Sequence, residues 1–279
     1  MVKKAQQIKR LMALMLCIGA LPFVFGASAY AGDGEKSEVS DQKSEIRSKY
    51  FDDYSAPVGF TYNAQAKMQA SYLWRGKYSG GPNIQGSANV GYGGLYFDMW
   101  WNIGVTDWTF KVFQPEVDFS LGFSRWGLNV YVLYIYNFNT PFFDFGNYAN
   151  KGNRLELDVR YTLSSKIPLS ILWATRVAAS DGYLDENGNV VRAYSSYAEI
   201  SYTQNLRDGW SVYGAIGVTP WKGTYNPNGA ALQNIEFRIR KDWDLGNRCG
   251  LMAQGQVAVS PMTAINVINL NATVGVYLK

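Results

Sequence analysis

The last stretch of the chain, from Ile268 to Leu278, alternates between apolar and polar side chains without a break. Successive side chains of a β-strand point to opposite faces, so this alternation predicts a strand with one apolar and one polar face. Ordinary strands run about 5–6 residues, whereas a strand that crosses a membrane within a barrel needs about 9–11. An open sheet edge in lipid leaves backbone groups unpaired. The stretch therefore predicts a closed membrane β-barrel, in which it pairs with the first strand.

Residues 1–31 have the pattern of a cleaved export signal. The positive start of this signal is formed by Lys3, Lys4, Lys9 and Arg10. An apolar run from Leu11 to Phe25 follows, which is too short to span a membrane comfortably as a helix. Small residues at Ala29 and Ala31 predict cleavage between Ala31 and Gly32. The four basic residues account for the net charge of +4, so the remaining chain is nearly neutral and has no basic block that would bind nucleic acid.

The residue types that most enzymes rely on are scarce. The chain has no histidine, and its one cysteine after the signal is Cys249. The usual general base and the commonest metal ligand are therefore missing, and no intramolecular disulfide can form. Phosphate-binding loops and nucleophile elbows are also absent. We expect no enzymatic activity, no cofactor and no metal. The remaining enzymatic alternative is a hydrolase inside the barrel that uses only the carboxylates of Asp98, Glu116 or Asp118.

Residues 32–60 are polar and charged, which is typical of a flexible segment. We expect a periplasmic tail here. The alternative is a small plug helix that docks at the barrel mouth, since Val39 and Ile46 could share one helical face. Residues 61–279 would then form the barrel.

The barrel region contains strand patterns at regular intervals, and connections that alternate between short turns and longer loops. Barrels of bacterial outer membranes have an even number of strands, short periplasmic turns and longer outer loops. The sequence thus predicts an all-β fold, an antiparallel transmembrane β-barrel of about twelve strands. The predicted strands are Tyr62–Leu73, Ile84–Tyr92, Leu95–Gly104, Glu116–Phe123, Leu128–Phe138, Arg154–Leu163, Leu169–Val177, Ser195–Thr203, Trp210–Thr219, Ile235–Arg240, Leu251–Val259 and Ile268–Leu278.

The polar face of each strand should line the lumen. The charged residues predicted there are Lys67, Asp98, Glu116, Asp118, Arg154, Glu156, Asp158, Arg160, Arg176, Glu199, Glu236, Arg238 and Arg240. The fourth strand faces the tenth in a ring of twelve, so we expect an acidic wall on strands three and four opposite a basic wall on strands one and ten. The alternative is that these charges pair across a narrow, filled bore. The short turn 164–167 should place Glu156 opposite Arg176.

Two predicted outer loops carry further candidate residues. The third loop contains an aromatic group that could constrict a pore or stack on a sugar, or could simply pack on itself: Phe142, Phe143, Phe145 and Tyr148. The fourth loop has oxygen-bearing side chains at spacing two around Asn187-Gly188. Val190 and Ser196 stand where a calcium loop needs Gly and Glu, so a hairpin tip is the better interpretation.

The stretch Tyr72-Leu73-Trp74-Arg75-Gly76, followed by Gly81–Gly86 and Trp100–Ile103, resembles the first hairpin of the TorF-type family of outer-membrane porins. The resemblance covers Tyr72–Val105 and implies a barrel in the bacterial outer membrane. Barrels of about eight strands are filled by side chains and those of about sixteen hold water, so twelve strands leave both states open.

We therefore expect a narrow porin-like channel for small polar solutes in the outer membrane of a Gram-negative bacterium. The alternative is a closed structural or binding barrel that presents aromatic loops outward. The expected partners are the lipid bilayer with its lipopolysaccharide, the outer-membrane insertion machinery and small polar solutes, and nucleic acid is not expected.

Overall fold

The computed structural model describes residues 59–106, 111–138, 140–145, 152–246, 248–262 and 267–278. Every regular element in this part is a β-strand, and no helix among these residues is long and apolar enough to cross a membrane. The predicted signal, the cleavage site at Ala31 and Gly32, and residues 32–58 lie outside the described residues. They stay predictions.

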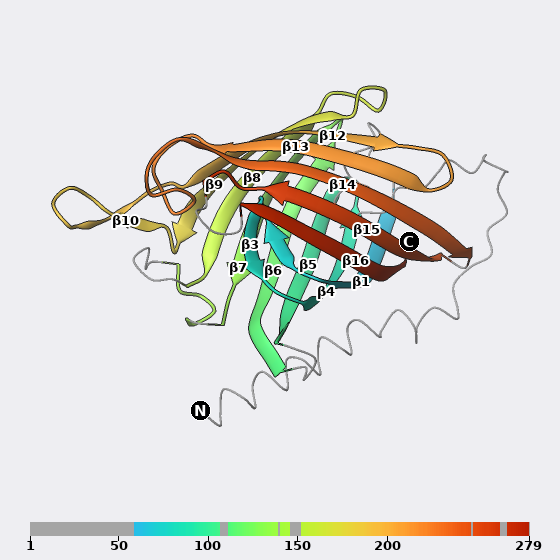
Figure 1. Cartoon of the computed structure of the whole chain (residues 1–279), viewed down its shortest axis with the longest axis horizontal. Helices are drawn as coiled ribbons and strands as arrows, with labels where there is room; N and C mark the ends of the chain where they lie inside the picture. Colours follow the sequence, from blue (N-terminus) through green and yellow to red (C-terminus); the bar gives the residue numbers. More distant parts are fainter. Residues whose placement is uncertain are drawn as a thin grey trace. The chain divides into compact units, whose positions relative to one another are not determined.

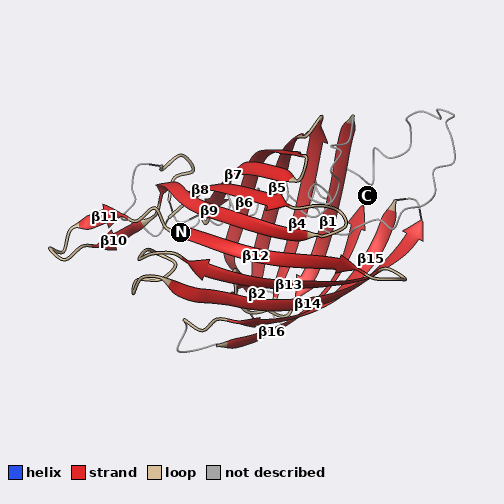
Figure 2. Cartoon of the chain, turned by 90° about the horizontal axis from the view of Figure 1, so that it is seen from above, coloured by secondary structure: helices blue, strands red, loops and turns tan. Residues whose placement is uncertain are grey.

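Twelve strands close into one antiparallel barrel, as predicted (Figure 1, Figure 2). The order around the ring is that of the chain, and β16 pairs with β1 to close it, with Val276 opposite Ala66. The strands of the ring are β1 (Phe60–Gln69), β4 (Asn83–Tyr92), β5 (Leu95–Thr106), β6 (Lys111–Arg125), β7 (Leu128–Tyr136), β8 (Arg154–Thr162), β9 (Leu169–Ala179), β12 (Ser196–Asn205), β13 (Trp210–Thr219), β14 (Ala231–Gly246), β15 (Cys249–Val259) and β16 (Ile268–Leu278).

Alternation along the strands separates an apolar exterior from a polar interior. On β16, Leu270 is 73 % exposed and Val274 is 59 % exposed, while Asn271 and Thr273 between them are buried. The closed ring pairs the backbone groups of its strands, so no sheet edge has to face lipid. A continuous apolar exterior of this kind is stable in a bilayer and not in water. The barrel is therefore built to span a membrane.

The two ends of the barrel differ in their connections. One end has the turns 93–94, 126–127, 163–168 and 206–209, whereas the opposite end carries two extra hairpins. Strands β10 (Gly182–Leu184) and β11 (Val190–Arg192) project beyond the barrel (Figure 2). Gly188 at their tip has a φ of 79°, and the Asp185 carboxylate accepts hydrogen bonds from the backbone of Asn187 and Asn189. The predicted hairpin tip is confirmed.

The second extra hairpin corrects one strand prediction. The predicted strand Tyr62–Leu73 ends at Gln69, and the chain leaves the wall of the barrel at Ser71. The side chain of Asn271 accepts a hydrogen bond of 3.0 Å from the Ser71 backbone, and this bond takes the place of a ladder bond. Strands β2 (Tyr72–Trp74) and β3 (Lys77–Gly80) then form a hairpin of their own. Strands β5, β6 and β14 are also longer than predicted.

Candidate functional site

The tip of the β2–β3 hairpin is a two-residue turn. Trp74 pairs with Lys77, and the intervening Arg75 and Gly76 have φ angles of 49° and 77°. Two positive φ angles at these positions define a type I′ turn, which fits the twist of the flanking strands. A Cβ atom on Gly76 would lie 2.5 Å from the side-chain oxygen of Asn234. A positive φ is uncommon for arginine, so surrounding contacts must hold Arg75 in place.

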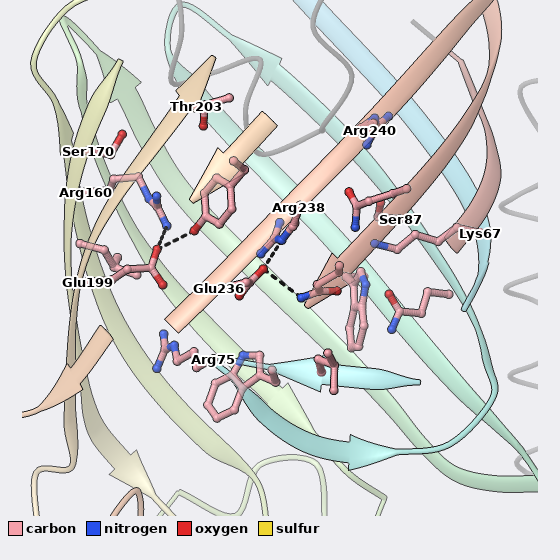
Figure 3. A pocket seen from close by; sticks show the side chains of 18 of the residues that line it. Lys67, Arg75, Ser87, Arg160, Ser170, Glu199, Thr203, Glu236, Arg238 and Arg240 are labelled. Carbon is pink, nitrogen blue, oxygen red and sulfur yellow. Dashed lines mark hydrogen bonds and ion pairs between the residues drawn. The ribbon is translucent and has the colours of Figure 1, made fainter. Parts of the chain in front are cut away.

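The hairpin lies inside the lumen and contacts strands on several sides of the ring (Figure 3). Tyr72 lies 5.6 Å from Trp100 of β5, measured between ring centroids. Its hydroxyl donates a hydrogen bond of 2.7 Å to Glu116 of β6. On the other side, the side chain of Gln233 from β14 donates to the backbone oxygen of Arg75 over 3.2 Å. Together with the bond from Ser71 to β16, these contacts fix the hairpin across the bore.

The guanidinium of Arg75 forms the ionic centre of the site. Its Nη2 lies 2.6 Å from Oε1 of Glu156 and its Nη1 lies 3.1 Å from Oε2, so Glu156 is bound in a bidentate manner. Nη2 also lies 3.2 Å from Asp158. The carboxylates of Glu156 and Asp158 are 0 % and 1 % exposed. Burial lowers the pKa of Arg75, but the charges of Glu156 and Asp158, with Tyr225 and the hydrogen bonds to Glu156, together outweigh it, and the pKa lies above its ordinary value. The guanidinium is therefore charged.

Aromatic rings surround the same guanidinium. Its central carbon lies 4.6 Å from the ring centroid of Trp74, 4.8 Å from that of Tyr197 and 5.5 Å from that of Tyr225. Trp74 belongs to the hairpin, Tyr197 to β12 and Tyr225 to the loop that follows β13. The Tyr225 hydroxyl donates a hydrogen bond of 2.6 Å to Glu156. We refer to Glu156, Asp158, Tyr197 and Tyr225 as the Arg75 cage, since they come from outside the hairpin and enclose its one arginine.

A polar cavity of about 330 Å³ extends from the hairpin toward the short-turn end of the barrel (Figure 3). Trp74 and Arg75 line one end, and Asn205 and Ser211, next to the turn 206–209, line the other. Among the predicted lumen residues, those that line this cavity are Lys67, Asp98, Asp118, Asp158, Arg160, Glu199, Glu236, Arg238 and Arg240. Their contact with a passing solute stays a prediction.

The remaining predicted lumen residues lie at or near the level of the hairpin. Glu156 pairs with Arg176 across β8 and β9, so the predicted register is confirmed. The ionic partners differ from the expected ones, because Glu156 binds Arg75 while Arg176 donates to Thr224 and stacks on Tyr225. Glu116 accepts the hydroxyl of Tyr72, and Arg154 stands at the start of β8 opposite Ala179.

Ion pairs within the walls reduce the predicted contrast between an acidic and a basic side. Strands β6 and β14 are six places apart in the ring and therefore face each other, as expected. However, Arg238 contacts Glu236 of its own strand, and Nη2 of Arg240 lies 3.0 Å from Asp242. Asp242 was not among the predicted residues. The sequence could have indicated it, because residues two apart on a strand share a face.

The aromatic third loop packs on the outward face of the barrel. The Phe142 ring lies 5.9 Å from Phe119, 5.2 Å from Tyr134 and 5.0 Å from Tyr136. Phe119 shares its face with Leu121, which is 65 % exposed. The neighbouring Phe143 and Phe145 extend this self-packed cluster, and Tyr148 lies outside the described residues. Of the three alternatives for the third loop, the described part therefore fits the self-packed one. The element that narrows the lumen is the first loop, with its β2–β3 hairpin, which the sequence analysis did not single out. No group of three or more metal-binding side chains occurs among the described residues.

No protein-family model matches the sequence, and no curated protein matches it. Solved structures with a similar fold include an outer-membrane channel from Pseudomonas putida F1, at 14 % identity and a TM-score of 0.46, over 81 % of this chain and 97 % of that one. The NanC porin matches at 10 % identity and a TM-score of 0.45, over 78 % of this chain and 100 % of that one. OmpF of Salmonella typhi, in complex with daunomycin, matches at 9 % identity and a TM-score of 0.37, over 78 % of this chain and 97 % of that one.

Proposed function

We propose that the protein is a narrow channel for small polar solutes in the outer membrane of a Gram-negative bacterium, with the β2–β3 hairpin as its constriction. The observation that carries this proposal is the polar cavity of about 330 Å³, which reaches from the short-turn end to the tip of the hairpin. Bacterial outer membranes hold barrels of this kind with the short turns in the periplasm. In this orientation, the hairpin enters the lumen from the extracellular end of the barrel and narrows the channel there.

The lining of the cavity indicates the class of solute. Lysine, arginine, aspartate and glutamate side chains all reach it, together with glutamines such as Gln254 and Gln256. Such a wall hydrates polar solutes and disfavours apolar ones. The proposal includes membership of the TorF-type family, because the stretch that carries that resemblance, Tyr72–Val105, begins with the residues that build the hairpin. It also includes two partners, a bilayer with lipopolysaccharide and the outer-membrane insertion machinery. We propose neither enzymatic activity nor nucleic-acid binding.

Conductance across planar bilayers tests the proposal. Three forms would be compared: the wild type, a form in which residues 72–80 are replaced by a short Gly-Asn-Gly turn, and a control in which the projecting hairpin 182–192 is shortened. We expect small openings from the wild type, larger openings when residues 72–80 are replaced, and wild-type behaviour from the control. In SDS gel electrophoresis, slower migration of the boiled sample than of the unboiled sample would verify that each form folds into a barrel.

A closed binding barrel is the second candidate, and the buried ion pair between Arg75 and Glu156 favours it. A hairpin held by such a pair could be a permanent plug. This candidate predicts that the folded wild type and the folded control conduct no ions, and that conductance appears only when residues 72–80 are replaced. That result would contradict the channel.

A further inference from the structure

The Arg75 cage is a guanidinium site that the barrel supplies and the hairpin fills. We propose that the cage binds small molecules with a guanidinium group, which take the place of Arg75 and release the hairpin from the lumen. The release rests on the proposed channel function, whereas the binding does not.

The geometry of the cage matches a guanidinium more closely than an ammonium. Glu156 binds both terminal nitrogens of Arg75, at 2.6 and 3.1 Å, and Asp158 approaches one of them at 3.2 Å. A planar fork can satisfy such an arrangement, and a compact ammonium cannot. The rings of Tyr197 and Tyr225 lie within 5.5 Å of the guanidinium carbon and stabilise a delocalised cation.

The charges near the cage favour a single positive ligand. Without Arg75, Glu156 still lies opposite Arg176 on β9, whereas Asp158 lies opposite Ala174. Asp158 then lacks the guanidinium that lies 3.2 Å from it, and a buried carboxylate without a cation is unfavourable until one enters. A ligand with one guanidinium restores the balance that Arg75 provides.

A solute in the cavity can reach the cage. Arg75 and Asp158 both line the cavity, so one side of their ion pair faces its interior. Arg75 also occupies a backbone conformation with a φ of 49°, which costs energy for a residue with a Cβ atom. A free ligand does not carry that backbone cost. Besides the ring contact between Tyr72 and Trp100, the other hairpin anchors named above are single hydrogen bonds, such as that of Tyr72, which water can replace at a small loss.

The tether of Arg75 should still make the wild type a weak binder. A residue held beside its own site competes at an effective concentration in the millimolar range or higher. We therefore expect Arg75→Ala to bind methylguanidinium at least about tenfold more tightly than the wild type does.

The experiment compares full-length variants in detergent and in planar bilayers, with methylguanidinium as the probe and methylammonium at equal concentration as its control. In Arg75→Ala, we expect methylguanidinium to raise the unfolding temperature and to block part of the conductance, and methylammonium to do neither. The double variant Arg75→Ala/Glu156→Gln should lose both responses. Arg125→Ala is the matched control, because Arg125 stacks on Trp126 at the short-turn end, 4.4 Å from its ring centroid. The responses of this variant to both probes, in unfolding temperature and in conductance, should equal those of the wild type.

Equal responses to the two probes, or an unchanged response in the double variant, would overturn the cage as a guanidinium site. A thermal response without conductance in any variant would support binding and reject the channel. Conductance without either response would reject the cage and leave the channel standing. If Arg75→Ala does not fold, Arg75→Gln allows the same comparison with a side chain that keeps its polarity.

Discussion

The ion pair between Arg75 and Glu156 should couple these two residues strongly. Removing one partner of a buried ion pair costs about 3–5 kcal/mol, because the other charge stays buried without compensation. In this protein, Arg176 lies opposite Glu156 on the next strand and offsets part of the loss. We therefore expect Arg75→Ala to cost about 3 kcal/mol, at the lower end of that range.

The double variant Arg75→Ala/Glu156→Gln removes both charges and should cost less than the sum of the single changes. The difference, measured as a coupling free energy from unfolding in urea, should reach about 2–3 kcal/mol. A matched cycle with Arg176→Ala in place of Arg75→Ala should give a smaller coupling, because Arg176 donates to Thr224 and Glu156 is bound by Arg75.

The same free energy should appear in channel gating. If the hairpin leaves the lumen when the channel opens, a loss of about 3 kcal/mol raises the ratio of open to closed states about a hundredfold. Single-channel recordings of the wild type and of Arg75→Ala measure this ratio. Additivity of the single changes within about 0.5 kcal/mol, with unchanged open times, would refute the hairpin as a latch held by Arg75.

Three further changes test the lipid face, the hairpin turn and the charged walls. Val274→Arg places a charge on an exterior that is 59 % exposed at that residue and should cost about 2–4 kcal/mol in a bilayer. Gln254→Arg, in the cavity, should be tolerated, and equal costs for both would contradict the assignment of faces. Gly76→Ala brings a Cβ atom to 2.5 Å from a facing asparagine oxygen and should loosen the hairpin, seen as larger conductance. Replacing Arg238 and Arg240 together with serine should shift the reversal potential in a salt gradient toward cations, and an unchanged potential would count against the charged walls.

The barrel could be predicted from the sequence because its signal is local. Each strand needs only alternation over its own length, and the predicted bounds of Ile268–Leu278 and Trp210–Thr219 are those of the structure. The short turn 164–167 also allowed Glu156 to be placed opposite Arg176, because a short turn fixes the register of the strands that it joins. The prediction of Tyr62–Leu73 as one strand was wrong because β2 is itself a strand. The alternation therefore continues through Ser71 and does not mark the point where the chain leaves the wall.

The hairpin inside the lumen could not be placed from strand patterns, since a loop that folds inward has the same sequence period as one that folds outward. A local signal did exist. Arg75 and Gly76 stand between Trp74 and Lys77, and two residues ending in glycine are typical of a tight hairpin turn. That signal predicts the turn and leaves its direction open, because the direction depends on charges that lie far away in the sequence.

Those distant charges explain why this loop folds inward. Glu156 and Asp158 share the lumen face of β8, because they are two residues apart on one strand. Across from Asp158 lie Tyr131 on β7 and Ala174 on β9. Tyr131 donates one hydrogen bond of 2.7 Å, but neither residue can supply a positive charge. A buried carboxylate needs a cation, so the neighbouring strands leave this position incomplete. Arg75 completes it from a loop, and the electrostatics of β8 thereby determine which loop folds inward and narrows the lumen.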